Sequence, residues 1–288
     1  MFCAPGIKKN LRGCFDRLAL IRIIESYNSR YPQNQIKYEK NLTDIELWNL
    51  IRNSFANVCS DNEWCWLDQD FVVNDLFLQD YYKPPKPDRP TKWLSTTDIN
   101  RVLKQFENIY DDFAFMGTVP IDFDQVIDEY AKMDLCALYN GRGLLSATGG
   151  MLHHNRRIRR FGFVFNLDPS TKRGSHWVAM FLDLTVAQPY IGYFDSYGYC
   201  PPPEEIMVLM DRLKKQAHKC LKVNLVKKCN VIRHQHKNTE CGLYGLYFIY
   251  NCLRGKSFET ITENIILDDD VNKYRDFFFR PTIHFIED

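Results

Sequence analysis

The spacing of apolar positions divides the chain into a helical first part and a second part that mixes strands with helices. Between residues 41 and 56, apolar side chains recur at helical spacing behind Thr43 and Glu46, which are placed as a capping box. A second candidate helix covers residues 15–27. The proline-rich stretch 83–90 follows and is typical of an extended linker. We expect an N-terminal, mainly helical module over 1–82, a linker over 83–91 and a larger domain over 92–288.

The larger domain opens with a helical pattern from residue 96 and continues with short runs typical of strands. Runs rich in β-branched and aromatic residues lie at 160–167, 176–184, 190–194, 221–226 and 230–235. Between the third and fourth runs, residues 203–217 carry one apolar helical face, and residues 239–253 are apolar nearly all round. The second of these predicts a central, buried helix. The pattern therefore predicts an α+β fold in which helices pack on a sheet.

Composition and charge favour a soluble protein without a global attraction to nucleic acid. The formal net charge of +1 gives no global attraction to nucleic acid. No stretch predicts a membrane span or a secretory signal, so we expect a cytoplasmic protein. Ten cysteines spread over 288 residues are then expected to be reduced. Cys59 and Cys65 could form part of a metal site, but buried apolar cysteines are the favoured interpretation.

Cys241 is the cysteine whose position best suits a nucleophile. It follows the polar turn 236–240 and opens the expected buried helix. The partial positive charge and free N–H groups at a helix N-terminus favour the reactive thiolate form of cysteine. Cys241 is therefore the candidate nucleophile, and its catalytic role requires a base within reach of the sulfur.

His176 and Asp195 are placed to serve that nucleophile. His176 begins one expected strand and Asp195 closes the next, so their side chains can meet at one edge of the sheet. The imidazole could act as base, and the carboxylate could hold its tautomer. The alternatives are a structural histidine and, for the Asp-Ser-x-Gly sequence, simple turn chemistry.

Gln235 is a candidate donor to the oxyanion of acyl transfer. It lies six residues before Cys241 at the end of an expected strand, and the backbone N–H of Cys241 could be a second donor. His234 and His236 flank it. Since neighbours on a strand point to the opposite face, we expect both histidines to be structural or exposed to solvent.

The ordered set Gly-x-His-Trp, Tyr-Phe-Asp-Ser-x-Gly and Gln-x5-Cys-Gly resembles the SUMO-specific and adenain-like cysteine peptidases. The resemblance covers residues 93–253 and implies a circularly rearranged papain-like core. It implies that His176 is the base, Asp195 its orienting acid, Gln235 the oxyanion donor and Cys241 the nucleophile. Trp93 and Trp177 would line a channel for the glycines of a Gly-Gly substrate, although Trp177 could equally be a core residue. The resemblance requires no metal or other cofactor.

The layout, a compact peptidase domain behind a small module, resembles polyprotein-processing peptidases of large cytoplasmic DNA viruses. It implies a maturation endopeptidase that cleaves structural polyproteins after Gly-Gly-x in host cytoplasm or virion. The first alternative is a protease for SUMO or another ubiquitin-like modifier. An acetyltransferase of the same clan is a further alternative, but these enzymes usually carry Glu where this chain has Asp195.

A basic stretch precedes the first of the late strands. It could contact DNA, which adenain-like enzymes use as a cofactor, through four arginines: Arg156, Arg157, Arg159 and Arg160. The favoured interpretation of such a run is a solvated face.

Overall fold

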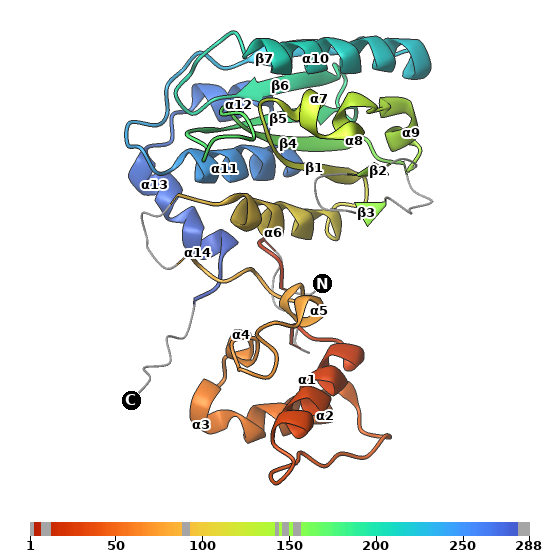
Figure 1. Ribbon diagram of the computed structural model, residues 1–288, viewed down its shortest axis with the longest axis vertical. Helices are drawn as coiled ribbons and strands as arrows, with labels where there is room; N and C mark the ends of the chain where they lie inside the picture. Colours follow the sequence, from red (N-terminus) through yellow and green to blue (C-terminus); the bar gives the residue numbers. More distant parts are fainter. Residues whose placement is uncertain are drawn as a thin grey trace. The chain divides into compact units, whose positions relative to one another are not determined.

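The computed structural model describes residues 3–6, 13–87, 93–141, 144–145, 150–151 and 157–281 (Figure 1). The chain forms two compact units. The first comprises Met1–Lys86 together with Arg275–Asp288, and the second comprises Pro87–Tyr274. In the expected division, the segment from Arg275 belonged to the larger domain over 92–288, whereas here it clusters with the first unit.

The first unit is built from short helices around a small apolar core. Its helices are α1 (Arg17–Arg30), α2 (Asp44–Ser54), α3 (Ala56–Cys59), α4 (Glu63–Trp66) and α5 (Leu76–Gln79). The expected capping box is present: the Thr43 hydroxyl accepts from the Glu46 N–H, and the Glu46 carboxylate accepts from the Thr43 N–H. Leu20, Ile24 and Leu47 are fully buried where α1 packs on α2. A mainly helical module is what the apolar spacing predicts.

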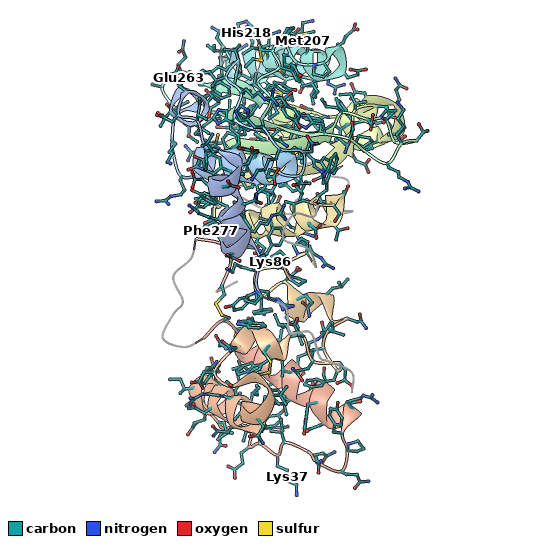
Figure 2. All side chains as sticks on the ribbon, turned by 90° about the vertical axis from the view of Figure 1, so that its left-hand side faces the viewer. Lys37, Lys86, Met207, His218, Glu263 and Phe277 are labelled. Atoms are coloured by element: carbon teal, nitrogen blue, oxygen red, sulfur yellow. A yellow bond between two sulfur atoms is a disulfide. The ribbon has the colours of Figure 1, made fainter. Side chains whose placement is uncertain are left out.

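Arg280 ties the late segment into the first unit. Its guanidinium group is buried and lies 2.6 Å from the Asp68 carboxylate, and it donates to the Gln79 side chain at 3.0 Å. Its backbone N–H donates to the carbonyl of Pro84 and its carbonyl accepts from Lys86, the residue labelled in Figure 2. Residues 84–86 of the expected linker therefore pair with the backbone of Arg280. The proline content of the linker could not indicate this pairing.

The second unit contains a mixed five-stranded sheet with the order β1-β4-β5-β6-β7. The strands are β1 (Phe113–Pro120), β4 (Arg160–Asn166), β5 (Trp177–Asp183), β6 (Tyr190–Phe194) and β7 (Val226–Cys229). β4, β5 and β6 are antiparallel neighbours, whereas β1 and β7 run parallel to β4 and β6 at the two edges. A separate two-stranded sheet pairs β2 (Leu144–Leu145) with β3 (Gly150–Met151).

Helices cover both faces of this sheet (Figure 1). On one face lie α7 (Phe123–Val126), α8 (Asp128–Ala131), α9 (Leu135–Tyr139) and α10 (Glu204–Gln216), which extends into the π-helical turn η1 (Ala217–Leu221). On the other lie α6 (Thr96–Glu107), packed on β1, and α11 (Cys241–Leu253), packed on β5. The chain continues through α12 (Phe258–Glu263), α13 (Asp268–Asn272) and α14 (Tyr274–Phe278). The α+β prediction is confirmed, and every residue of α11 is buried, as its apolar sequence predicts.

Two of the expected strands are wrong. Residues 221–226 contribute only Val226 to a strand, because η1 prolongs α10 and Lys222 turns the chain through a left-handed conformation with φ of 58°. Residues 230–235 form no strand. The N–H groups of His234 and Gln235 both donate to the Ser196 carbonyl, which is incompatible with the alternation of a ladder. β1, by contrast, was not expected, although its residues are apolar and partly aromatic.

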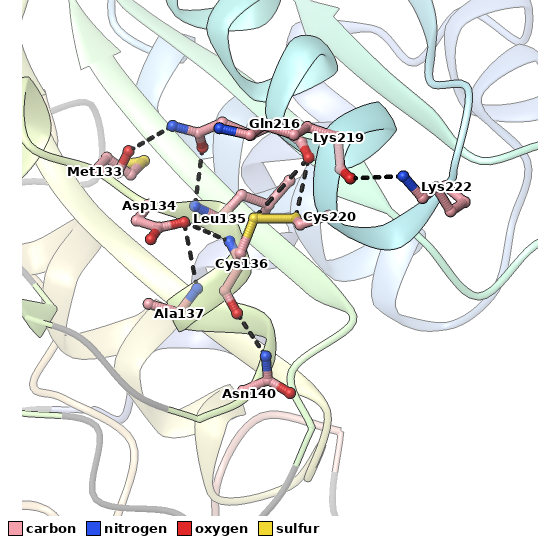
Figure 3. The surroundings of a disulfide bond; sticks show 10 residues. All are labelled: Met133, Asp134, Leu135, Cys136, Ala137, Asn140, Gln216, Lys219, Cys220 and Lys222. Carbon is pink, nitrogen blue, oxygen red and sulfur yellow. Dashed lines mark hydrogen bonds between the residues drawn. A yellow bond between two sulfur atoms is a disulfide. The ribbon is translucent and has the colours of Figure 1, made fainter.

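The expectation of reduced thiols is also wrong. Eight of the ten cysteines are paired, in the disulfides Cys3–Cys14, Cys59–Cys65, Cys136–Cys220 and Cys200–Cys229. Cys59 and Cys65 are thus bonded to each other rather than to a metal. The third bridge joins α9 to η1 across 84 positions of sequence, beside Gln216, which bonds to the backbone of Met133 and Leu135 (Figure 3). Such long-range pairing cannot be deduced from cysteine spacing.

Among the residues that the structure describes, no helix is long and apolar enough to cross a membrane.

Candidate active site

Cys241 lies at the first position of α11, the helix that packs on the central strand β5. All ten cysteines lie in the described part of the chain, and Cys241 and Cys252 are the two that form no disulfide. The Cys241 side chain is buried. Glu240 precedes it, and its carbonyl accepts the N–H of Tyr244 in the first turn of the helix. The buried Glu240 carboxylate accepts from the Asn272 side chain at 3.0 Å, and these contacts fix where the helix begins.

His176 and Asp195 meet at the edge of the sheet beside Cys241. His176 directly precedes β5 and Asp195 directly follows β6, its antiparallel neighbour. The His176 Nε2 atom lies 2.7 Å from Asp195 Oδ1. Since Nε2 is engaged with the carboxylate, Nδ1 is the ring nitrogen left to face the Cys241 thiol. The structure thus brings together the three residues on which sequence reasoning placed nucleophile, base and orienting acid.

The surroundings of His176 favour its charged form. Burial of the ring by itself lowers the pKa of His176, but hydrogen bonds to Asp195 and Cys241 and the charges of these two groups outweigh it. The net result raises the pKa of His176 to about 9. Tyr197 lies against the imidazole with ring centroids 4.8 Å apart, and the Arg233 guanidinium lies over the Tyr197 ring at 5.2 Å from its centroid. An imidazolium can therefore persist at neutral pH in this pocket.

Asp195 is held by its backbone as well as its carboxylate. Asn230 accepts the Asp195 N–H at 2.8 Å and donates to its carbonyl at 2.7 Å, so an amide side chain continues the ladder where β7 has ended. The Tyr197 N–H donates to Asp195 Oδ1 at 2.8 Å. Asp195 is 1% exposed, and a buried carboxylate held in this way has one orientation.

Gln235 is buried between Ser196 and the backbone of residue 237. Its Oε1 accepts from the Ser196 hydroxyl at 2.6 Å, and its Nε2 donates to the Lys237 carbonyl at 2.7 Å. Ser196 is the residue that follows Asp195, and its carbonyl accepts the Gln235 N–H at 2.8 Å. The predicted oxyanion donor is therefore tied to the loop that carries the predicted acid.

The segment between Gln235 and Cys241 is fastened by Asp268. One oxygen of this buried carboxylate accepts from the N–H groups of His236 at 2.9 Å and Lys237 at 3.1 Å. The Tyr244 hydroxyl, from the first turn of α11, lies 3.3 Å from the other oxygen. Two N–H groups of this irregular backbone are thereby satisfied by one side chain.

The two flanking histidines differ in environment. His234 is fully buried: one ring nitrogen lies 3.0 Å from the Thr262 carbonyl, and the other accepts the Ile266 N–H at 3.3 Å. Burial, the larger cause, lowers the pKa of His234 despite the bond to Thr262. His236 is exposed. The burial of His234 and the exposure of His236 match the two environments expected of these histidines.

Trp177 is packed directly against the start of α11. Its indole N–H donates to the Leu94 carbonyl at 2.9 Å, and the residue is 8% exposed. A Cβ atom on Gly242 would lie 3.0 Å from Leu94 Cβ and 3.2 Å from Trp177 Cδ1, so a larger residue beside Cys241 would require this wall to shift by a few tenths of an ångström. A cavity of about 560 Å³ is lined by Trp177, by the half-exposed Trp93 and by the loop before His176. The two tryptophans of the expected channel therefore line one cavity.

The basic stretch is largely engaged within the unit. Arg160 bonds to the Asp112 carboxylate and donates to the Leu253 carbonyl at 2.9 Å, and Arg159 lies 3.4 Å from Asp112. Arg157 is exposed, and Arg156 lies outside the described residues.

Sequence reasoning missed the residues that hold this site: Ser196, Asn230 and Asp268. Ser196 stands in a sequence typical of a turn, Asn230 begins the run 230–235 that was predicted as a strand, and Asp268 is one of three consecutive acids. Asp268 differs from the neighbouring Asp269 and Asp270 in being buried. A single sequence does not indicate which of three consecutive acids is buried.

Comparison with known proteins agrees with this geometry. Residues 164–283 match the model of the Ulp1 protease family, C-terminal catalytic domain. The chain is 29% identical to a thiol protease of Acanthamoeba polyphaga mimivirus, over 96% of this chain and 93% of that relative. It is 32% identical to the SUMO-1 cysteine protease of African swine fever virus, over 70% of this chain and 73% of the relative.

A solved structure of the African swine fever virus protease has the same fold. It superposes with a TM-score of 0.68 at 24% sequence identity, covering 98% of this chain and 96% of the other. A selenomethionine form of that protease gives a TM-score of 0.66 at 27% identity, over 84% of this chain and 94% of the other. Given the family match and a 32% identical relative, of which the alignment covers 73%, this chain belongs to the Ulp1 protease family of cysteine proteases.

Proposed function

We propose that this protein is a maturation endopeptidase that cleaves viral structural polyproteins after Gly-Gly-x, in the host cytoplasm or in the virion. The observation that carries the proposed chemistry is the Asp195–His176 pair hydrogen-bonded beside Cys241 at the start of α11. The viral cysteine proteases to which the chain is similar over most of its length support a viral role.

In the proposed reaction the Cys241 thiolate attacks the carbonyl carbon of the residue before the scissile bond. The carbonyl oxygen becomes an oxyanion, which accepts from the Gln235 amide and the Cys241 N–H. His176, charged in the free enzyme, gives its proton to the leaving amine and the thioester forms. His176 then takes a proton from water, which attacks the thioester and releases Cys241. Asp195 keeps Nδ1 of the ring directed at the sulfur throughout.

The wall beside Cys241 supports a Gly-Gly preference. Leu94, Trp177 and Gly242 are in close contact there, and the cavity next to them is lined by both tryptophans that the sequence suggested. Substrate residues without side chains would pass such a wall without steric conflict. DNA has no part in the proposed reaction, and a contact with it would not use Arg160, whose guanidinium is already bonded to Asp112 and Leu253.

The alternative substrate is a folded modifier such as SUMO, because relatives from several African swine fever virus isolates are named SUMO-1 cysteine proteases. We would incubate the full chain with peptides carrying Gly-Gly-x junctions, with matched Ala-Gly-x and Gly-Ala-x peptides, and with a folded SUMO precursor. The proposal expects cleavage of Gly-Gly-x peptides alone or at least about tenfold faster than the Ala-substituted peptides. Processing of the folded precursor without peptide cleavage would replace it with the modifier-specific function.

The chain offers a matched cysteine control. Cys241→Ala should abolish cleavage, whereas Cys252→Ala should retain it, because Cys252 is buried at the far end of the same helix. Cleavage that survives in Cys241→Ala would remove the proposed nucleophile.

A further inference from the structure

We propose that Ser196 is a positioning residue that holds the Gln235 amide with its nitrogen toward the oxyanion. The inference rests on the role proposed above for Gln235. The Ser196 hydroxyl would affect the reaction only through the Gln235 side chain.

The contact between these residues is short and buried. The Ser196 Oγ atom lies 2.6 Å from Gln235 Oε1, and the two residues are 1% and 0% exposed. The Ser196 carbonyl accepts the N–H groups of His234 and Gln235, both at 2.8 Å. Ser196 thus fixes both the backbone and the side chain of Gln235. A hydroxyl–amide bond at that depth is shielded from solvent, so its loss would leave Oε1 a buried acceptor without this donor.

An amide side chain can stabilise an oxyanion only through its nitrogen, because its oxygen accepts and cannot donate. The nitrogen carries two hydrogens, and the Lys237 carbonyl accepts one of them at 2.7 Å. If the amide were reversed, Oε1 would face that carbonyl and two acceptors would meet. The Ser196 hydroxyl donor and the Lys237 carbonyl acceptor together select one orientation, and the second N–H is left for the substrate.

The same dipeptide serves both halves of the proposed chemistry. Asp195 orients the base, and the next residue, Ser196, orients the oxyanion donor. A displacement of this loop would therefore disturb general base and oxyanion donor together, while a change limited to the Ser196 hydroxyl should disturb the second alone.

The test compares a reaction that forms an oxyanion with one that does not. With 4-nitrophenyl acetate, the Cys241 sulfur bonds to the carbonyl carbon and the carbonyl oxygen becomes an oxyanion. When the carbon–oxygen double bond re-forms, 4-nitrophenolate leaves. With chloroacetamide, the sulfur displaces chloride at a tetrahedral carbon, and no oxyanion forms. Both rates would be measured for Ser196→Ala, Ser196→Thr, Gln235→Ala and the double variant Ser196→Ala/Gln235→Ala, with Cys241→Ala subtracted as background.

We expect Gln235→Ala and Ser196→Ala each to slow acetylation by about tenfold or more while alkylation stays within about twofold. Ser196→Thr, which keeps the hydroxyl, should recover most of the acetylation rate. In the Gln235→Ala background, Ser196→Ala should add less than about a twofold effect, since the amide it positions is gone. If Ser196→Ala does not fold, Ser196→Cys, a weaker donor, takes its place in the cycle.

Two results would overturn the proposal. One is a full multiplicative loss in the double variant, which would show that Ser196 acts independently of Gln235. The other is an equal loss of alkylation in Ser196→Ala, which would indicate a general disturbance of Cys241. Because 4-nitrophenyl acetate carries no glycine, these rates can be interpreted even if the enzyme shows no preference for Gly-Gly-x peptides. An unchanged acetylation rate in Gln235→Ala would contradict the proposed roles of both Gln235 and Ser196.

Discussion

The two sides of the candidate site are built on different principles. On one side, His176 and Asp195 stand at the ends of β5 and β6, neighbouring strands whose ladder fixes where each side chain emerges. On the other, Gln235 lies in the irregular segment between β7 and α11. There the backbone is held by side chains, chiefly Asn230 and Asp268.

This difference predicts where the site is vulnerable. The position of a strand end is fixed by all the hydrogen bonds of the ladder together. A substitution of one neighbouring residue therefore moves it little. An irregular segment depends on a few buried polar contacts, each of which leaves an unsatisfied group when it is removed. We therefore expect substitutions at the strand ends to act on the chemistry, and substitutions around the irregular segment to act on geometry and stability together.

The largest expected effect is that of His176→Gln. Without the imidazole, peptide cleavage should fall by at least about a thousandfold, because the proposed mechanism loses the group that protonates the leaving amine and activates water. His236→Gln is the matched control, since that imidazole is exposed to solvent. Comparable losses in both variants, measured as kcat/KM on a Gly-Gly-x peptide, would contradict the assignment of the base.

The same variant should change how stability depends on pH. The pKa of His176 is raised to about 9 from its ordinary value of 6.5, so the stabilisation is fully present below pH 6.5 and is lost as the pH rises through 9. At 1.36 kcal/mol per pKa unit, the loss is about 3 kcal/mol at most. Urea unfolding at several pH values should show this decline in the native chain and its absence in His176→Gln. Parallel curves for the two proteins would indicate that His176 titrates near its ordinary pKa.

The strand side of the site is also the side that could be predicted from sequence. Short apolar runs with aromatic and β-branched residues mark β5 and β6, and the residues that follow or precede such runs fall at the sheet edge. The predicted strand over 230–235 was wrong because its conformation is decided by contacts with Ser196, far away in sequence. The disulfide Cys136–Cys220 and the return of Arg280 to the first unit were missed for the same reason: they depend on tertiary proximity, which no local pattern encodes.

A pair of adjacent acids sharpens the comparison on the irregular side. Asp268 is buried and accepts two backbone N–H groups, whereas Asp269 is exposed and forms an ion pair with Lys237. Asp268→Asn should lower the free energy of unfolding by about 1–3 kcal/mol and reduce kcat, because an amide offers one acceptor oxygen in place of two. Asp269→Asn should leave stability nearly unchanged, as is usual for an exposed surface ion pair.

Thermal unfolding and peptide cleavage would be measured for Asp268→Asn and Asp269→Asn side by side. An Asp268→Asn protein as stable and active as Asp269→Asn would show that the irregular segment keeps its shape without this carboxylate.

The smallest expected effect comes from two glycines on α11. A Cβ at Gly242 would lie 3.0 Å from Leu94 Cβ, whereas at Gly245 it would meet Ala179 Cβ at an ordinary 3.7 Å. Gly242→Ala should cost about 1 kcal/mol or more of stability and raise KM for Gly-Gly-x peptides, because the wall beside Cys241 must shift. Gly245→Ala should be neutral or stabilise by about 0.5–1 kcal/mol, since alanine favours the helix. Both variants change the same helix by one methyl group, so a rise in KM in both would mean that helix propensity, and not the wall formed with Trp177, controls access to the site.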